Sequence, residues 1–167
     1  MRVITFLFPI LLVTFSANAQ KGQNSLSIGP SVGIPLNFST GYKTGFGGGI
    51  RGYFGVTPKG AVLANVNILS FPTKFSEGTG TLTSLKVGYR TYFNSAKFFI
   101  FGDGGLVKKS GEIGENDIDF GAGGGIGYSI TTGKNGSIDI VPSYNVVFQS
   151  VINRTWLDFH LAYRFKL

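Results

Sequence analysis

The chain contains no cysteine, one histidine and one tryptophan among its 167 residues. Without cysteine, disulfides cannot stabilise it, and thiolate sites for zinc or iron–sulfur clusters are excluded. Charged residues make up 14% of the chain, against roughly 25% in ordinary soluble proteins, whereas hydrophobic residues reach 43% and glycines number 26. A chain with this composition has too little charge to cover a surface that faces water on all sides.

Long hydrophobic runs are also lacking, apart from one at the N-terminus. A basic start at Arg2 precedes the apolar run 3–15, and the small-x-small pattern A-N-A at 17–19 is typical of a cleavage site. We therefore expect residues 1–19 to be a signal peptide for export through the secretory pathway and residues 20–167 to form one domain. No later run approaches the roughly 20 apolar residues that a transmembrane helix requires.

The last 13 residues alternate in polarity without a break. Side chains of a β-strand point alternately to opposite faces, and about 9–11 residues of a tilted strand cross an outer membrane. This segment is therefore predicted to be a membrane-spanning strand. Its apolar phase is Thr155, Leu157, Phe159, Leu161, Tyr163, Phe165 and Leu167, and its polar phase is Trp156, Asp158, His160, Ala162, Arg164 and Lys166.

Seven further segments are bounded by clusters of Gly, Pro, Asn, Ser or Thr, as strands are. The predicted strands are 25–34, 44–55, 61–70, 81–93, 96–107, 118–130, 137–149 and 155–167. No segment shows a sustained helical period. The sequence therefore predicts an all-β fold, an eight-stranded antiparallel up-and-down transmembrane β-barrel, which is the smallest size of membrane barrel.

All charged residues of the predicted strands fall on the phase opposite to the apolar one. Alternation alone also fits a soluble lipid-binding barrel with its apolar phase inside. The many glycines on the polar phase favour the membrane interpretation, because glycines leave room for large side chains in a narrow lumen. We expect a lumen charge network in which Asp103, Asp119, Asp139 and Asp158 neutralise Arg51, Lys86, Arg90 and Arg164.

The strand pattern and the ending LAYRFKL, 161–167, resemble the outer-membrane β-barrel domain family of small OmpX-, OmpW- and PorT-like proteins. The resemblance implies insertion by a barrel-assembly machinery that recognises the end of the last strand. Tyr163 and Phe165 match the alternating hydrophobic positions of that signal, and Leu167 stands where the family commonly has an aromatic residue. It implies no substrate.

Longer connections alternate with shorter ones, except that the seventh connection, 150–154, is short where a long one is due. The alternation predicts that the longer connections are external and that both termini lie in the periplasm of a Gram-negative bacterium. We expect external cations to contact lipopolysaccharide phosphates, surface ligands or a partner protein: Lys43, Lys74, Lys108, Lys109 and Arg154. The alternative is transport of small or hydrophobic solutes. The formal net charge of +7 does not indicate a nucleic-acid partner, because the cations are scattered and the protein is exported.

Catalysis and cofactor binding have weak support in the sequence. His160 lies on the polar phase two residues after Asp158, and Ser31 and Ser143 share that phase, but a lone strand histidine more often fills a lumen. The glycine strings 45–53 and 121–128 lack the following helix of a nucleotide site. Glu112, Glu115, Asn116, Asp117 and Asp119 lack the ligand spacing of a calcium loop. We expect a non-enzymatic protein without a cofactor.

Overall fold

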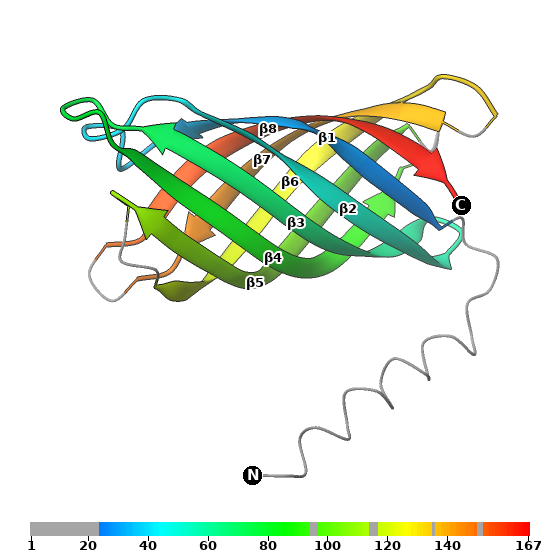
Figure 1. Cartoon of the computed structure of the whole chain (residues 1–167). Coiled ribbons are helices and arrows are strands. Elements are labelled where there is room, and N and C mark those ends of the chain that lie inside the picture. Colours follow the sequence, from blue (N-terminus) through cyan, green and yellow to red (C-terminus); the bar gives the residue numbers. More distant parts are fainter. Residues whose placement is uncertain (1–23, 94–96, 114–116, 135, 150–151) are drawn as a thin grey trace, which may run out of the picture.

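The computed structural model describes residues 24–93, 97–113, 117–134, 136–149 and 152–167. Each strand pairs antiparallel with the next, and β1 pairs with β8 to close the barrel (Figure 1). This confirms the predicted fold. The strands are β1 (Ser25–Pro35), β2 (Gly45–Thr57), β3 (Gly60–Pro72), β4 (Thr79–Tyr92), β5 (Phe98–Gly111), β6 (Ile118–Thr131), β7 (Gly136–Val147) and β8 (Arg154–Lys166). The predicted signal peptide lies outside the described residues.

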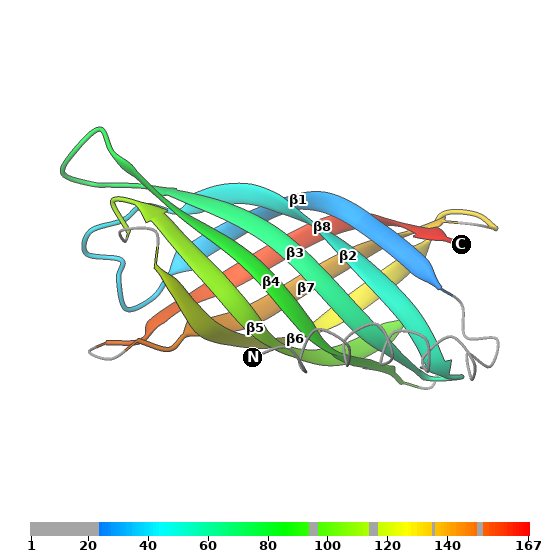
Figure 2. The same ribbon diagram turned by 60° about the horizontal axis from the view of Figure 1, so that its bottom comes forward.

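The two ends of the barrel differ. At one end, here called the turn end, β8 finishes and the turn at 58–59 joins β2 to β3. The opposite end, here called the loop end, carries the connection 36–44 between β1 and β2 and the connection 73–78 between β3 and β4. Figure 2 shows the loops at one end and the C-terminus at the other. The predicted alternation of long and short connections holds for these first three.

β5 runs further toward the loop end than the sequence indicated. It pairs with β4 as far as Gly111, opposite Gly80, whereas we predicted an end at 107. Lys108 and Lys109 therefore belong to a strand and not to a loop. Their side chains point to opposite faces, so Lys108 is exposed and Lys109 is buried. Lys108 is therefore a charged residue on the outer face at the end of its strand, beyond the strand limits for which an inward position was predicted.

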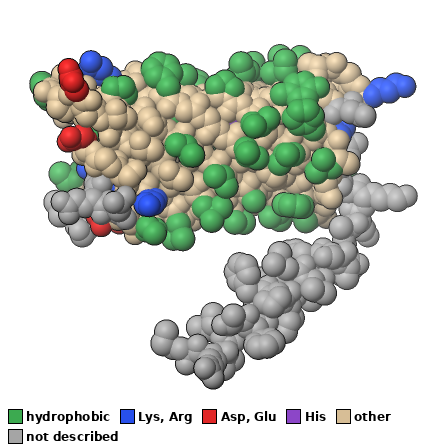
Figure 3. Space-filling model, in the orientation of Figure 1, with side chains coloured by type: hydrophobic (Ala, Val, Ile, Leu, Met, Phe, Trp, Pro, Cys, Tyr) green, Lys and Arg blue, Asp and Glu red, His purple; other side chains and the backbone are tan. Residues whose placement is uncertain are grey.

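The apolar phase of the strands faces outward. Hydrophobic side chains cover the barrel wall in Figure 3, and charged ones gather toward its ends. Aromatic residues lie on the outer face near each end, with Phe98 against Tyr128 at the turn end and Phe120 stacked on Phe148 at the loop end. Such an apolar belt between aromatic girdles is the lipid-facing surface of a membrane barrel. None of the described residues forms a helix that could cross a membrane.

Strand glycines make room for large side chains inside the barrel. A Cβ atom at Gly127 would overlap the ring of Phe99 on the neighbouring strand, and one at Gly45 would crowd the ring of Phe71. The interior of an eight-stranded barrel is just wide enough for side chains to fill it. Gly45 of β2 and Gly127 of β6 therefore make room for aromatic side chains, as the glycine-rich pattern indicated.

Two isoleucines of β6 provide a matched test of the lipid-facing belt. Ile118 and Ile126 are both 61% exposed on the outer face, but Ile118 is the first residue of the strand and Ile126 lies near its middle. We expect Ile126→Lys to lower the free energy of unfolding by about 2–4 kcal/mol and Ile118→Lys by about 0–1 kcal/mol, because the cost of a cation depends on its depth. Urea titration in lipid vesicles measures both values. Equal losses would contradict the lipid-facing assignment.

Candidate functional site

A cluster of buried apolar side chains lies inside the barrel at the loop end. This apolar cap consists of Phe38, Leu69, Phe71, Leu82, Val107, Ile113, Val147 and Trp156. Phe38 comes from the β1–β2 connection and Ile113 follows the end of β5, so chain outside the strands folds inward over the opening. The rings of Phe38 and Phe71 meet edge to face with their centroids 5.4 Å apart. The apolar cap thus combines inward side chains of β3, β4, β5, β7 and β8 with two residues from outside the strands.

Below the cap, Lys86 and Asp103 form the centre of a buried polar layer. Lys86 Nζ lies 3.5 Å from Asp103 Oδ1 and donates a 2.8 Å hydrogen bond to Asn145 Oδ1. Asn65 Nδ2 donates to the other carboxylate oxygen of Asp103 at 3.3 Å. A Cβ atom at Gly123 would stand 2.8 Å from Asp103 Oδ1 and 3.1 Å from Lys86 Nζ. The missing side chain of Gly123 therefore gives this ion pair its space.

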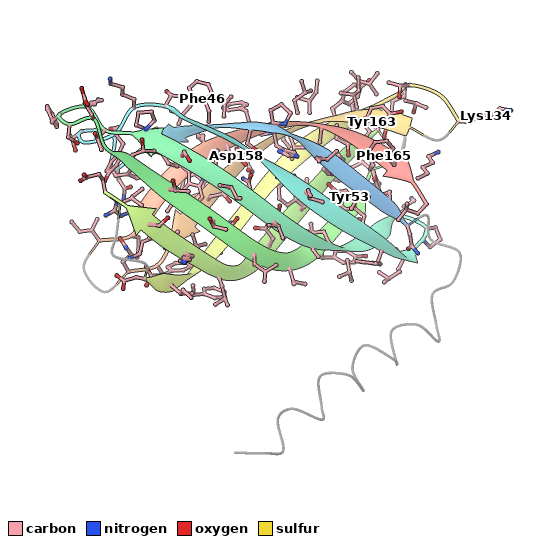
Figure 4. All side chains as sticks on the ribbon, in the orientation of Figure 1. Phe46, Tyr53, Lys134, Asp158, Tyr163 and Phe165 are labelled. Atoms are coloured by element: carbon pink, nitrogen blue, oxygen red, sulfur yellow. The ribbon has the colours of Figure 1, made fainter. Side chains whose placement is uncertain are left out.

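Arg51 and Asp158 are buried, but neither forms an ion pair with a described residue. The guanidinium of Arg51 lies over the ring of Phe101, 5.4 Å from its centroid, and Asp158 accepts a 3.4 Å hydrogen bond from Asn67 Nδ2. Figure 4 shows Asp158 on the barrel wall. The described residues thus show no direct ion pair between Arg51 and any of the four aspartates of the predicted lumen network.

A second ionic cluster, here called the turn-end cluster, joins Arg90, Asp139, Arg164 and Ser129. Asp139 Oδ2 lies 3.7 Å from Arg90 Nη1 and accepts a 3.0 Å hydrogen bond from Arg164 Nε. Ser129 Oγ donates a 2.7 Å hydrogen bond to Asp139 and accepts one from Arg164 Nη2 at 3.3 Å. Two guanidinium groups thus share one fully buried carboxylate.

Asp119 belongs to neither lumen layer. Its carboxylate lies 2.8 Å from Lys109 Nζ at the loop end, and it accepts a hydrogen bond from Gln149. Lys109 is only 6% exposed and also approaches Asp117 at 3.6 Å. Two predictions are therefore wrong, since Asp119 does not pair with the central cations and Lys109 is not an exposed external cation. The longer β5 strand is the reason, because it turns Lys109 to the inner face, where its side chain reaches Asp119 two register positions from its own backbone partner Asp117.

The lone histidine contacts a serine, as a hydrolase would require. His160 Nδ1 lies 2.8 Å from Ser31 Oγ, and Ser31 Oγ donates to Asn67 at 3.3 Å. A catalytic triad needs an acid on the second ring nitrogen, but His160 Nε2 has no described partner. Both residues are 2% exposed, and neither lines either of the two cavities described below. The contact between His160 and Ser31 is therefore a hydrogen bond inside the lumen. Neither side chain is reached from the two cavities, as a substrate would require.

Among the described residues, a cavity lies at each end of the barrel. The loop-end cavity has a volume of about 500 Å³ and lies beside Phe38, Tyr42, Gln149, Asn153 and Arg154. Its amides are already engaged: Asn153 Oδ1 accepts from the Gln149 N–H, and Gln149 Oε1 accepts from Arg154 Nε. The turn-end cavity has a volume of about 450 Å³ and is floored by the turn-end cluster. The apolar cap and the polar layers lie between the two cavities.

The remaining residues predicted to contact lipopolysaccharide or a partner differ in their exposure to solvent. Lys43, Lys74 and Lys108 are exposed, whereas Arg154 is half-buried over the ring of Phe38. Glu77, Glu112 and Asp117 are exposed at the same end, so the rim carries both signs of charge. Glu115 and Asn116 of the acid-rich segment lie outside the described residues. In the predicted assembly signal, Tyr163, Phe165 and Leu167 are exposed on the outer face, and the first two rings are in contact.

Solved structures with the same fold are small outer-membrane β-barrels. Neisserial surface protein A aligns over 86% of this chain and 97% of its own with a TM-score of 0.69 and 16% identity. Ail of Yersinia pestis aligns over 87% and 100%, with a TM-score of 0.61 and 16% identity. OprG of Pseudomonas aeruginosa aligns over 87% and 96%, with a TM-score of 0.53 and 10% identity. No protein-family model and no curated protein sequence matches the chain.

Substitution of two aspartates compares the contribution of a buried carboxylate to stability with that of an exposed one. Asp139→Asn removes the only carboxylate of the turn-end cluster, and we expect a loss of about 3–5 kcal/mol in the free energy of unfolding, because two buried guanidinium groups lose their counter-charge. Asp117→Asn, at a side chain 66% exposed, is the control, with an expected loss of about 0–1 kcal/mol. Urea titration of the folded protein measures both, and similar losses would show that the turn-end cluster is hydrated.

Proposed function

Because the chain has the fold of the small eight-stranded outer-membrane β-barrels, we propose that it is a non-enzymatic outer-membrane protein whose lumen is closed to solutes and whose external loops contact the cell surface or a partner. The turn end faces the periplasm and the loop end faces outward, as short turns and long loops do in bacterial barrels. The protein reaches this membrane by export.

The succession of buried side-chain clusters inside the barrel is the observation that supports this proposal. From the loop end inward, the barrel contains the apolar cap, the Lys86–Asp103 layer and the turn-end cluster. Toward the turn end, Tyr53, Ala61 and Leu63 form a second buried apolar cluster against Phe101, and the ring of Tyr53 stacks on Arg90 of the turn-end cluster. Solute transport would need a continuous path through all four layers, whereas the two cavities lie at opposite ends.

Lys108 is the external cation best placed for lipopolysaccharide phosphates. It lies on the outer face of β5, directly beyond Leu106 of the apolar belt, between Thr83 of β4 and Ile118 of β6. A cation at that depth meets lipid headgroups and not loop solvent, and each such lysine contributes roughly 1 kcal/mol near an anionic membrane surface. Lys43 and Lys74 are exposed on connections at the same end and remain available to a surface ligand or a partner protein.

Ail supplies a precedent for a polyanion at a barrel of this fold. Its structure in complex with the heparin analogue sucrose octasulfate aligns over 87% of this chain with a TM-score of 0.57 and 18% identity. Arg154, on the rim beside the loop-end cavity, extends the set of external cations that could meet such a ligand. Phosphate and sulfate groups accept the same charge-assisted hydrogen bonds from lysine and arginine.

Biogenesis by a barrel-assembly machinery is part of the proposal. The side chains of Tyr163, Phe165 and Leu167 follow one another along the outer face of β8, where a recognition partner has access to them. β8 also pairs with β1, so it provides the edge at which the barrel closes. The assembly machinery therefore recognises the signal on β8 before β8 pairs with β1 and closes the barrel.

Planar-bilayer recording tests the closed lumen. We expect no large, stable open channel from folded protein, because four side-chain layers fill the barrel. A heat-dependent band shift in SDS shows that the inserted sample is folded, and a general porin shows that the bilayer reports conductance. A reproducible open channel, or measurable solute flux into vesicles, would instead favour the transport function.

Adding lipopolysaccharide to phosphatidylcholine vesicles tests the role of Lys108. We expect lipopolysaccharide to raise the free energy of unfolding of the unaltered protein, and Lys108→Gln to remove about 1 kcal/mol of that gain. Lys134→Gln is the control, since Lys134 is exposed at the turn end (Figure 4). Equal gains in all three proteins would contradict the proposed contact.

A further inference from the structure

The turn-end cavity carries an excess of positive charge. Arg90, Arg164 and Lys166 line it, and no acidic residue is among its described lining residues. Asp139 lies behind the wall of the cavity, is 0% exposed, and contacts both arginines. One carboxylate therefore faces three cations, and an anion that enters this cavity meets no like charge on its surface.

Several buried donors around this cavity have no protein partner. Arg90 is 2% exposed, yet neither its Nε nor its Nη1 forms a hydrogen bond with a described residue, and the hydroxyl of Ser137 is likewise unpartnered. The 3.7 Å separation of Arg90 Nη1 from Asp139 is an ion-pair distance, too long for a hydrogen bond. Buried donors without an acceptor are costly, so such groups usually have a partner in the native state.

Aromatic rings fix the position of these donors. The guanidinium of Arg90 lies 3.6 Å from the ring centroid of Tyr53, 4.6 Å from that of Tyr92 and 4.9 Å from that of Phe99. Stacking occupies the faces of a guanidinium plane and leaves its N–H edge free to donate. The preorganised edge of Arg90 therefore needs little reordering to bind an anion.

A serine flanks Arg164 on each neighbouring strand. Ser27 of β1 and Ser137 of β7 are both register partners of Arg164, and both hydroxyls are buried without a described hydrogen-bond partner. Ser129, which also lines the cavity, already bonds Arg164 and Asp139. Hydroxyl groups beside guanidinium groups provide the mixed donors that a tetrahedral oxyanion accepts.

We propose that the turn-end cavity is a binding site for a phosphate group, held by Arg90, Arg164, Lys166 and Ser137. A phosphate has more acceptor positions than a carboxylate and so engages more of these separate donors. The cavity volume of about 450 Å³ leaves room for an organic group attached to the phosphate. The group comes either from a soluble phosphate or from the headgroup of a phospholipid beside the barrel.

The site depends on the barrel fold but not on the closed lumen. A channel seen in planar bilayers would refute the proposed function and leave phosphate binding to be decided by its own measurement. Conversely, a closed barrel without phosphate affinity would refute only the site.

Calorimetric titration of the folded protein in a zwitterionic detergent with inorganic phosphate tests the proposal, with sodium chloride at matched ionic strength as the reference. We expect saturable binding of phosphate but not of chloride, and an affinity about tenfold lower in Lys166→Gln, since a charged hydrogen bond is lost. Arg164→Gln serves as a second variant, with its folding checked by the heat-dependent band shift. Lys134→Gln, an exposed turn-end cation that does not line the cavity, keeps full affinity.

A parallel arm identifies the source of the phosphate group. Folded protein is unfolded with urea in vesicles of phosphatidylcholine and in vesicles with added phosphatidylglycerol. A gain in stability from phosphatidylglycerol that Lys166→Gln loses and Lys134→Gln keeps supports a lipid headgroup, whereas calorimetric binding alone supports a soluble phosphate. Absence of both effects overturns the site, as does an equal loss of affinity in Lys166→Gln and Lys134→Gln.

Discussion

The need to satisfy every backbone hydrogen bond within the membrane constrains the rest of this structure. Hydrocarbon offers no partner to an exposed N–H or C=O group, so a sheet that crosses it has to close on itself. Pairing of β1 with β8 closes this barrel. Closure gives every strand one face toward lipid and one face toward a narrow lumen. The alternation of apolar and polar residues along each strand follows from these two faces.

In a narrow lumen, the space for each side chain depends on the size of its neighbours. With only eight strands, each large inward side chain needs a neighbouring position without one, which is why Gly123 stands beside the Lys86–Asp103 pair and Gly127 beside Phe99. The same confinement removes water from the ionic groups, so each charge requires a counter-charge, a hydrogen bond or an aromatic face. Arg90 has two of these, namely Asp139 and three rings, and still retains unpartnered donors toward the turn-end cavity.

The two ends of the barrel are chemically unlike. At the loop end, Phe38 and Ile113 complete an apolar cap, and the rim outside it carries charges of both signs. The turn end instead leads to Arg90, Arg164 and Lys166 around a cavity. The positively charged cavity and the rim of mixed charge thus lie at opposite ends of the barrel, with the buried clusters of the described residues between them.

The sequence by itself determined the strand number, the phase of each strand and the inward position of Lys86, Arg90, Asp103, Asp139 and Arg164. Those features depend on alternation along one strand, and alternation is local. Only the tertiary structure decided which charges meet, because partners lie on different strands and their heights depend on register and on where each strand ends. Hence Arg51 lies against Phe101, Lys109 against Asp119 and His160 against Ser31. Phe38 and Ile113 carried no periodic signal, since their role arises where chain outside the strands folds over the opening that closure creates.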